Sequence, residues 1–144
     1  MSKNTTPPFD FLADLGRVLV IFGRWLRYGS GPSTGERRAE LERLRREWQK
    51  LELDFDEPLA ARQAIIRADI ILDKALSLNG YFGNTVGERL KRASQRLDRT
   101  VLDAAWRAHK IRNRLAHALD QVPTSAEINS AAKDYALALN YLGV

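Results

Sequence analysis

The sequence predicts an all-α protein, in which a four-helix up-and-down bundle over residues 58 to 143 is preceded by two extra N-terminal helices. Apolar residues recur at spacings of three and four along most of the chain, which is the period of an amphipathic helix. Capping residues, glycine and proline stand at the junctions between these stretches. No stretch alternates apolar and polar residues as a half-buried strand does. We therefore divide the chain into an N-terminal region, residues 1–57, and a helical bundle, residues 58–144.

The N-terminal region begins with a polar tail and continues in a strongly amphipathic stretch, residues 9–28. Its apolar side chains form one stripe at helical spacing, and arginines mark the other side. The charges of Asp14, Arg17, Arg24 and Arg27 argue against a membrane span, because each costs roughly 2.5–3.5 kcal/mol near the bilayer centre. We expect this helix to pack on the rest of the protein or on a partner. The alternative is a peripheral membrane contact, in which the helix lies in the plane of the surface.

A second, highly charged helix is expected over residues 33 to 53. Ser33 and Glu36 have the spacing of a capping box. Its apolar positions form a narrow seam, which consists of Leu41, Leu44, Trp48 and Leu51. Such a seam is typical of a short coiled-coil-like arm or of a helical hairpin with the preceding segment.

Start and stop residues mark four helices in the bundle. Proline suits a first helical position, a threonine followed three residues later by glutamate suits an N-terminus, and Asn-Gly suits a helix end. The expected helices run from Pro58 to Asn79, from Thr85 to about Leu97, from Asp98 or Thr100 to about Leu119, and from Thr124 to about Gly143.

The composition limits the kinds of functional site that the chain can form. The 144 residues include no cysteine and two histidines, so disulfides and cysteine-ligated metals are excluded. The histidines are eight residues apart with only Asp103 and Asp120 nearby, so we expect neither a metal site nor a cofactor. A chain without thiols suits the cytoplasm, and membrane association stays open. Net charge is +5, and residues 85–119, with nine basic and three acidic groups, carry +6, as a phosphate-binding surface requires.

The helix expected over residues 100 to 119 has two distinct sides at 100° per residue. One side is the expected core, made of Ala104, Ala108, Ile111, Leu115, Ala118 and Leu119. The other is mixed and holds Leu102, Ala105, His109, Arg112, Asn113, Ala116 and His117. Both histidines of the chain fall on this mixed stripe. It is either a surface stripe in water or one wall of a cleft or helix–helix contact, and we favour the cleft.

The polar groups of this stripe suit metal-independent RNA cleavage. Histidine both accepts and donates a proton near neutral pH, so His117 can activate a ribose 2′-hydroxyl or protonate the leaving oxygen. Arg112 offers a donor fork for the phosphorane, and Asn113 can position a phosphate or an imidazole. The neighbouring His109, Lys110 and Arg114 are candidate RNA-binding residues. One such histidine per chain is too few to serve as both the general acid and the general base. We therefore expect a homodimer, which brings a second copy of the histidine to the site.

Residues 106–117, which read WRAHKIRNRLAH, contain an arginine and a histidine separated by four residues and resemble the R-x4-H signature of HEPN domains. Residues 79–90 are similar to the turn and short helix of some bacterial HEPN-like proteins. The resemblance covers roughly residues 58 to 143. It implies a HEPN-like bundle that dimerises, with Arg112 and His117 as the catalytic pair and Asn113 beside them.

The same resemblance implies a metal-independent endoribonuclease of a toxin or defence system, with RNA as substrate and an antitoxin or regulatory protein as partner. Other members of the family have lost catalysis and bind RNA, nucleotides or proteins. A third hypothesis makes residues 9–28 the working element of a membrane-surface or assembly protein.

Overall fold

The computed structural model describes residues 32–52, 58–117 and 122–144. In this part of the chain the only regular secondary structure is α-helix, and turns join the helices. The prediction of an all-α bundle is thereby confirmed. In chain order the helices are α2 (Thr34–Glu52), α3 (Pro58–Leu78), α4 (Val86–Ala93), α5 (Arg99–His117) and α6 (Ser125–Tyr141).

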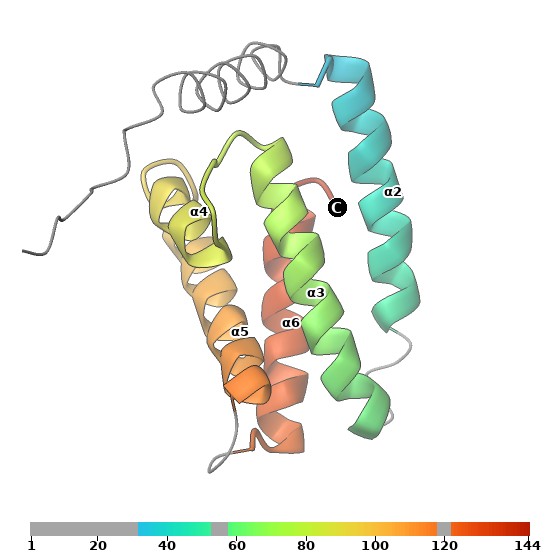
Figure 1. Cartoon of the computed structure of the whole chain (residues 1–144), viewed down its shortest axis with the longest axis vertical. Helices are drawn as coiled ribbons and strands as arrows, with labels where there is room; N and C mark the ends of the chain where they lie inside the picture. Colours follow the sequence, from blue (N-terminus) through green and yellow to red (C-terminus); the bar gives the residue numbers. More distant parts are fainter. Residues whose placement is uncertain (1–31, 53–57, 118–121) are drawn as a thin grey trace, which may run out of the picture. The chain divides into compact units, whose positions relative to one another are not determined.

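Helix α3 is the centre of the bundle, because it contacts each of the other four helices. The long helices alternate in direction along the chain, with α2 on one side of α3 and α5 on the other (Figure 1). Helix α6 packs along both α3 and α5, and the short α4 contacts α3 and α5. The long helices α3, α5 and α6 thus run side by side, and α4 lies against two of them.

Helix α2 belongs to the bundle rather than to a separate arm. Its residues Leu44, Trp48 and Leu51 are buried in the same apolar core as the other helices, and the compact unit begins at Thr34. The seam is narrow because α2 packs on α3 along one line, whereas its other faces carry charge. The boundary expected after residue 57 therefore separates α2 from helices with which it shares a core.

The end of α3 is fixed by the residues that predicted it. Gly80 has a φ of +83°, which L side chains rarely adopt, and directs the chain out of the helix. The Asn79 amide donates to the carbonyls of Ala75 at 2.9 Å and Leu142 at 3.0 Å, and its oxygen accepts from Arg37 at 3.0 Å. One side chain thus joins the end of α3 to α2 and to the turn after α6.

The remaining helix starts follow the expected capping residues. Thr85 caps α4, and Thr124 with Glu127 forms a complete capping box on α6. Helix α4 ends at Ala93, short of the expected Leu97, because the chain there forms a tight turn in which Leu97 N–H donates to Ala93 O at 2.8 Å. At α5 the Asp98 carboxylate accepts from the backbone of Thr100 at 2.8 Å, so Asp98 precedes the helix.

The N-terminal helix expected over residues 9–28 lies outside the described residues, and so do its expected packing and the alternative of a membrane contact. Ala118 and Leu119 lie outside them as well. None of the helices in the described ranges is long and apolar enough to cross a membrane.

Candidate functional site

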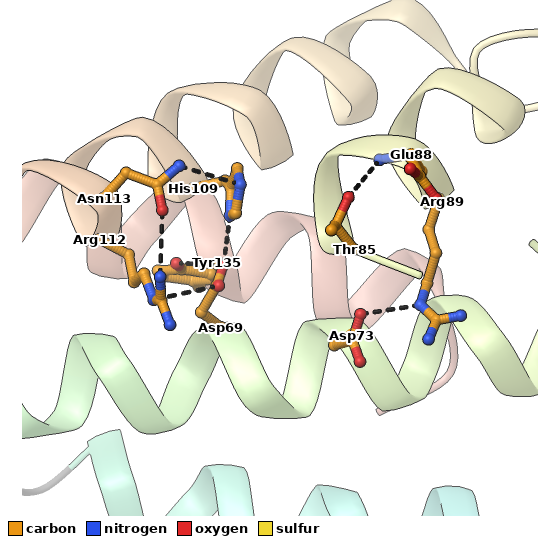
Figure 2. A network of polar contacts seen from close by, with 9 residues as sticks. All are labelled: Asp69, Asp73, Thr85, Glu88, Arg89, His109, Arg112, Asn113 and Tyr135. Atoms are coloured by element: carbon orange, nitrogen blue, oxygen red, sulfur yellow. Dashed lines mark hydrogen bonds and ion pairs between the residues drawn. The ribbon is translucent and has the colours of Figure 1, made fainter. Parts of the chain in front are cut away.

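Five polar side chains from three helices meet between α3, α5 and α6 (Figure 2). We call this set the Asp69 network, and it consists of Asp69 from α3, His109, Arg112 and Asn113 from α5, and Tyr135 from α6. The contacts of Asp69 with His109 and Tyr135 thus join residues that lie 40 and 66 positions apart in the sequence.

The carboxylate of Asp69 is the hub of the network. Its side chain is only 4% exposed, because Asp69 stands four residues after Ile65 and three before Leu72 on the core-facing side of α3. One carboxylate oxygen accepts from the Tyr135 hydroxyl at 3.0 Å and contacts Nδ1 of His109 at 2.9 Å. A buried carboxylate is costly unless it is paired and hydrogen-bonded, and here several groups meet that need.

The hydrogen-bond pattern fixes the tautomer of His109. Arginine has no acceptor, so the Asn113 oxygen faces Arg112 and accepts from Nη1 at 3.1 Å. The Asn113 amide nitrogen then donates to Nε2 of His109 at 3.1 Å, which requires Nε2 to carry no proton. The ring therefore carries its proton on Nδ1 and donates it to Asp69. In this arrangement the Asn113 amide bridges Arg112 and His109, whereas the buried Nε of Arg112 makes no hydrogen bond within the described ranges.

Tyr135 contributes the second donor to Asp69. Its ring is fully buried, and burial, with the nearby negative charge of Asp69, raises the pKa of its hydroxyl far above the ordinary value. Tyr135 thus stays protonated and remains a donor at all physiological pH values.

Arg112 is the member of the network that reaches solvent. Its Nε faces the second oxygen of Asp69 at 3.5 Å, longer than a charge-assisted hydrogen bond, and its side chain is 32% exposed. Nη2 makes no hydrogen bond to any of the residues that the structure describes. The guanidinium is therefore anchored at one edge by a buried carboxylate and open at the other.

A pocket of about 500 Å³ lies over this network, between α3, α5 and the start of α4. It is lined by Asp69, Ile70, Asp73, Asn84, Thr85, Val86, Gly87, His109, Arg112 and Asn113. An ion pair between Arg89 and Asp73, at 2.8 Å, holds α4 on α3 beside the pocket (Figure 2). The Trp106 ring meets the His109 ring edge-on, with centroids 6.2 Å apart. The pocket can hold a phosphate-bearing group against Arg112.

The structure brings three of the six predicted site residues to this pocket, namely His109, Arg112 and Asn113. His117 is exposed at the last position of α5 and does not line the pocket, and Lys110 is exposed as well.

Arg114 is half-buried and pairs with Glu127, whose carboxylate it contacts at 2.5 Å. The hydrogen bond from Arg114, helped by the backbone of Thr124, lowers the pKa of Glu127 to about 2. Arg114 therefore joins α5 to the start of α6.

The two sides expected for α5 need a correction. Ala105, which we placed on the mixed stripe, is 1% exposed and lies in the core, and Leu102 packs against that core. Conversely, Ile111 and Leu115 on the expected core side are only partly buried. The reason is that α3, α4 and α6 all contact α5, so its N-terminal half is covered over a wider arc than a single stripe.

Sequence reasoning missed Asp69 and Tyr135. The available signal for Asp69 was an acidic residue at a core position of an otherwise apolar helix face, which requires buried partners. Tyr135 lies between the buried Ala131 and Ala138 on the core side of α6, where a tyrosine hydroxyl needs an acceptor. Neither signal names the other residue, because the contact joins separate helices.

Within the described ranges, no group of three or more histidine, cysteine, aspartate or glutamate side chains is arranged to hold a metal ion. No family model, no curated protein and no solved structure matches the chain.

Proposed function

We propose that this protein is a metal-independent endoribonuclease that works as a homodimer with a composite Arg/His active site. The observation that carries the proposal is Arg112, which is anchored on the buried Asp69 and opens into a pocket. The R-x4-H spacing of residues 112 to 117 and the all-helical bundle around it support the same reading.

Arg112 suits the role of a phosphate ligand. The buried carboxylate behind it fixes the guanidinium without covering Nη2, so the open edge is preorganised for phosphate oxygens. Asn113 and His109 hold the guanidinium from the side, since Nη1 donates to Asn113. Such an anchored cation stabilises charge that develops on the phosphorane without having to reorganise during the reaction.

The reaction is transesterification within the RNA. The ribose 2′-oxygen forms a bond to the adjacent phosphorus, and the bond from phosphorus to the 5′-oxygen breaks. A histidine takes the 2′-proton and a second group protonates the leaving 5′-oxygen, which yields a 2′,3′-cyclic phosphate and a 5′-hydroxyl. We assign proton transfer to His117, which is exposed and therefore free to meet RNA. A second copy of the chain supplies the other proton-transfer group.

Exposed apolar side chains on α3 support a homodimer. Leu59, Ile66 and Ile70 are 69, 38 and 48% exposed and lie on one stripe of the helix. Ile70 also lines the pocket over the Asp69 network, so a second copy packed on this stripe comes close to Arg112. Ile70→Glu should therefore give a monomer in sedimentation analysis, and an unchanged dimer would contradict this interface.

The resemblance to HEPN domains extends the proposal to a cytoplasmic toxin or defence component, held in check by an antitoxin or regulatory protein. Residues 9–28 then serve either as a contact for such a partner or as a membrane tether.

Incubation of mixed RNA in EDTA tests the proposal. Wild-type protein and the control Asn129→Ala, an exposed polar residue of α6, should cleave and leave 2′,3′-cyclic phosphate ends. His117→Ala and Arg112→Lys should not, with helical content and unfolding transition close to wild type. Cleavage by His117→Ala at the wild-type rate, or cleavage that EDTA abolishes, would refute the mechanism.

A non-catalytic binding module is the second candidate, and a specific observation favours it. His109 and Asn113 are committed to one another, to Arg112 and to Asp69, and His117 does not line the pocket. Such a module binds RNA, a nucleotide or a protein at Arg112 and leaves it intact. RNA that binds with steep salt dependence and stays uncut by wild-type protein would select this function.

A further inference from the structure

A group of basic side chains surrounds the turn between α4 and α5, away from the residues that line the pocket. Residues 89–97 hold four basic and no acidic residues. Arg89 is paired with Asp73, but the other three are exposed and form no ion pair with any residue in the described ranges. We call these three the α4–α5 basic cluster, and they are Lys91, Arg92 and Arg96.

The cluster stands on a fixed backbone. Leu90 and Ala93 are fully buried and Leu97 is 9% exposed, so apolar anchors alternate with the basic residues. Backbone and hydroxyl hydrogen bonds close the turn, from Ser94 Oγ to the carbonyl of Lys91 at 2.6 Å and from Arg96 N–H to that of Ala93 at 2.9 Å. Three cations are therefore exposed on this turn without an ion-pair partner among the described residues. Their like charges repel one another, and this repulsion favours the binding of a polyanion.

We propose that the α4–α5 basic cluster is a second contact surface for RNA, which binds the phosphate backbone beyond the nucleotide held at Arg112. This inference rests on the proposed function, because it takes RNA as the ligand of the pocket. The start of α4 lines the pocket and its end carries the cluster. From Gly87 to Arg92 the helix rises by about 8 Å, so a strand that follows α4 passes from one to the other within a few nucleotides.

The surroundings of the cluster favour RNA over a membrane surface. Membrane-surface helices present apolar side chains that enter the headgroup region. The apolar residues among positions 89–97 all point into the core instead. Contacts with phosphates need exposed charge and no apolar insertion, which is what this turn offers.

The expected effect follows from counterion release. For single strands, log of the binding constant falls with log of the salt concentration by about 0.7 per neutralised phosphate, so three cations contribute a slope of about 2. Between 50 and 200 mM salt this amounts to roughly a 20-fold larger loss of affinity for a protein that has the cluster than for one that lacks it.

The test is fluorescence anisotropy of a labelled single-stranded RNA in EDTA, with His117→Ala in every protein so that the RNA stays intact. The cluster variant is Lys91→Gln, Arg92→Gln and Arg96→Gln together. The matched control on α2 is Arg38→Gln, Arg46→Gln and Lys50→Gln, which removes the same charge from exposed positions. We expect a weaker and less salt-dependent complex for the cluster variant and an unchanged one for the control.

Equal affinity of the cluster variant and the parent overturns the proposal, as does an equal loss in the α2 control. Cluster-dependent binding to phosphatidylserine vesicles without binding to RNA overturns it as well. Cleavage by protein that retains His117 is measured separately in the same buffer. Absence of cleavage with cluster-dependent RNA binding refutes the nuclease and leaves this surface standing.

Discussion

Replacing Asp69 by asparagine removes one negative charge from the core and keeps the size of the side chain. The carboxylate now accepts from His109 and Tyr135 and faces Arg112 at 3.5 Å. The asparagine oxygen can keep the first two contacts only if its NH2 group faces Arg112, which is itself a donor. In either orientation, therefore, the NH2 group of the asparagine faces at least one other hydrogen-bond donor.

The cost can be worked out from these contacts. A hydrogen bond to a charged group contributes about 1.5–3 kcal/mol and a neutral one about 0.5–1.5 kcal/mol, so each of two bonds loses about 1 kcal/mol. Loss of the partner charge for Arg112 adds about 1 kcal/mol, at the upper end of the range for exposed ion pairs and below that for buried ones, because the arginine is a third exposed. We expect about 3 kcal/mol, out of a total stability of about 5–15 kcal/mol.

Urea unfolding at pH 7 and 25 °C, followed by circular dichroism, measures this loss. Asp103→Asn is the matched control, because its carboxylate is 55% exposed and should change stability by less than about 0.5 kcal/mol. In a double-mutant cycle, Tyr135→Phe and Asp69→Asn should be coupled by about 1 kcal/mol, since they share a hydrogen bond. If Asp69→Asn and Asp103→Asn unfold at the same urea concentration, Asp69 is not the hub described above.

Four further variants test other parts of the structure by the same unfolding measurement. Leu44→Ala should lower the free energy of unfolding by about 2–5 kcal/mol, because Leu44 is fully buried. A loss below about 1 kcal/mol would contradict the packing of α2 in the bundle core. Gly80→Ala should destabilise by about 1–2 kcal/mol because φ is +83°, whereas Gly35→Ala within α2 should stabilise by up to about 1 kcal/mol; both sites have free space, so equal effects would contradict the backbone argument. The pKa of Glu127, about 2 in the folded protein, lies below its ordinary 4.5, so its pairing with Arg114 stabilises fully above pH 4.5 and is lost as the pH falls towards 2. The stability difference between wild type and Glu127→Gln should shrink over that range, and a constant difference would exclude the ion pair as its cause.

The parts of the fold that the sequence predicted are those set by neighbours in the chain. A capping box needs residues three apart, as Thr124 and Glu127 are, and Asn79 with Gly80 ends a helix through local backbone geometry. The grouping of His109, Arg112 and Asn113 follows from helical spacing alone, so these three could be placed on one side of a helix before the structure was known.

The parts that the sequence could not predict depend on contacts between helices. The side of α5 that Asp69 meets is decided by how α3 packs on it, and no local pattern specifies that register. The same holds for α2, whose apolar seam fits a coiled coil or a bundle equally well until its partner is known. Arg114 shows the converse error: it stands within the motif, yet Glu127 from another helix takes it as an ion-pair partner.

The two sides of the pocket differ in their resistance to local opening. Helix α4 has eight residues and buries two of them, so it is too short to persist without its contacts to α3 and α5. In native-state hydrogen exchange its amides should exchange through openings of lower free energy than those around Ala104 and Ala108 of α5, which are fully buried. Residues 84–87 thus form the side of the pocket that opens at lower free energy, and the Asp69 network forms the more stable side. We therefore expect a ligand larger than the pocket to gain room at residues 84–87, where the pocket meets the start of α4, while the guanidinium of Arg112 keeps its place.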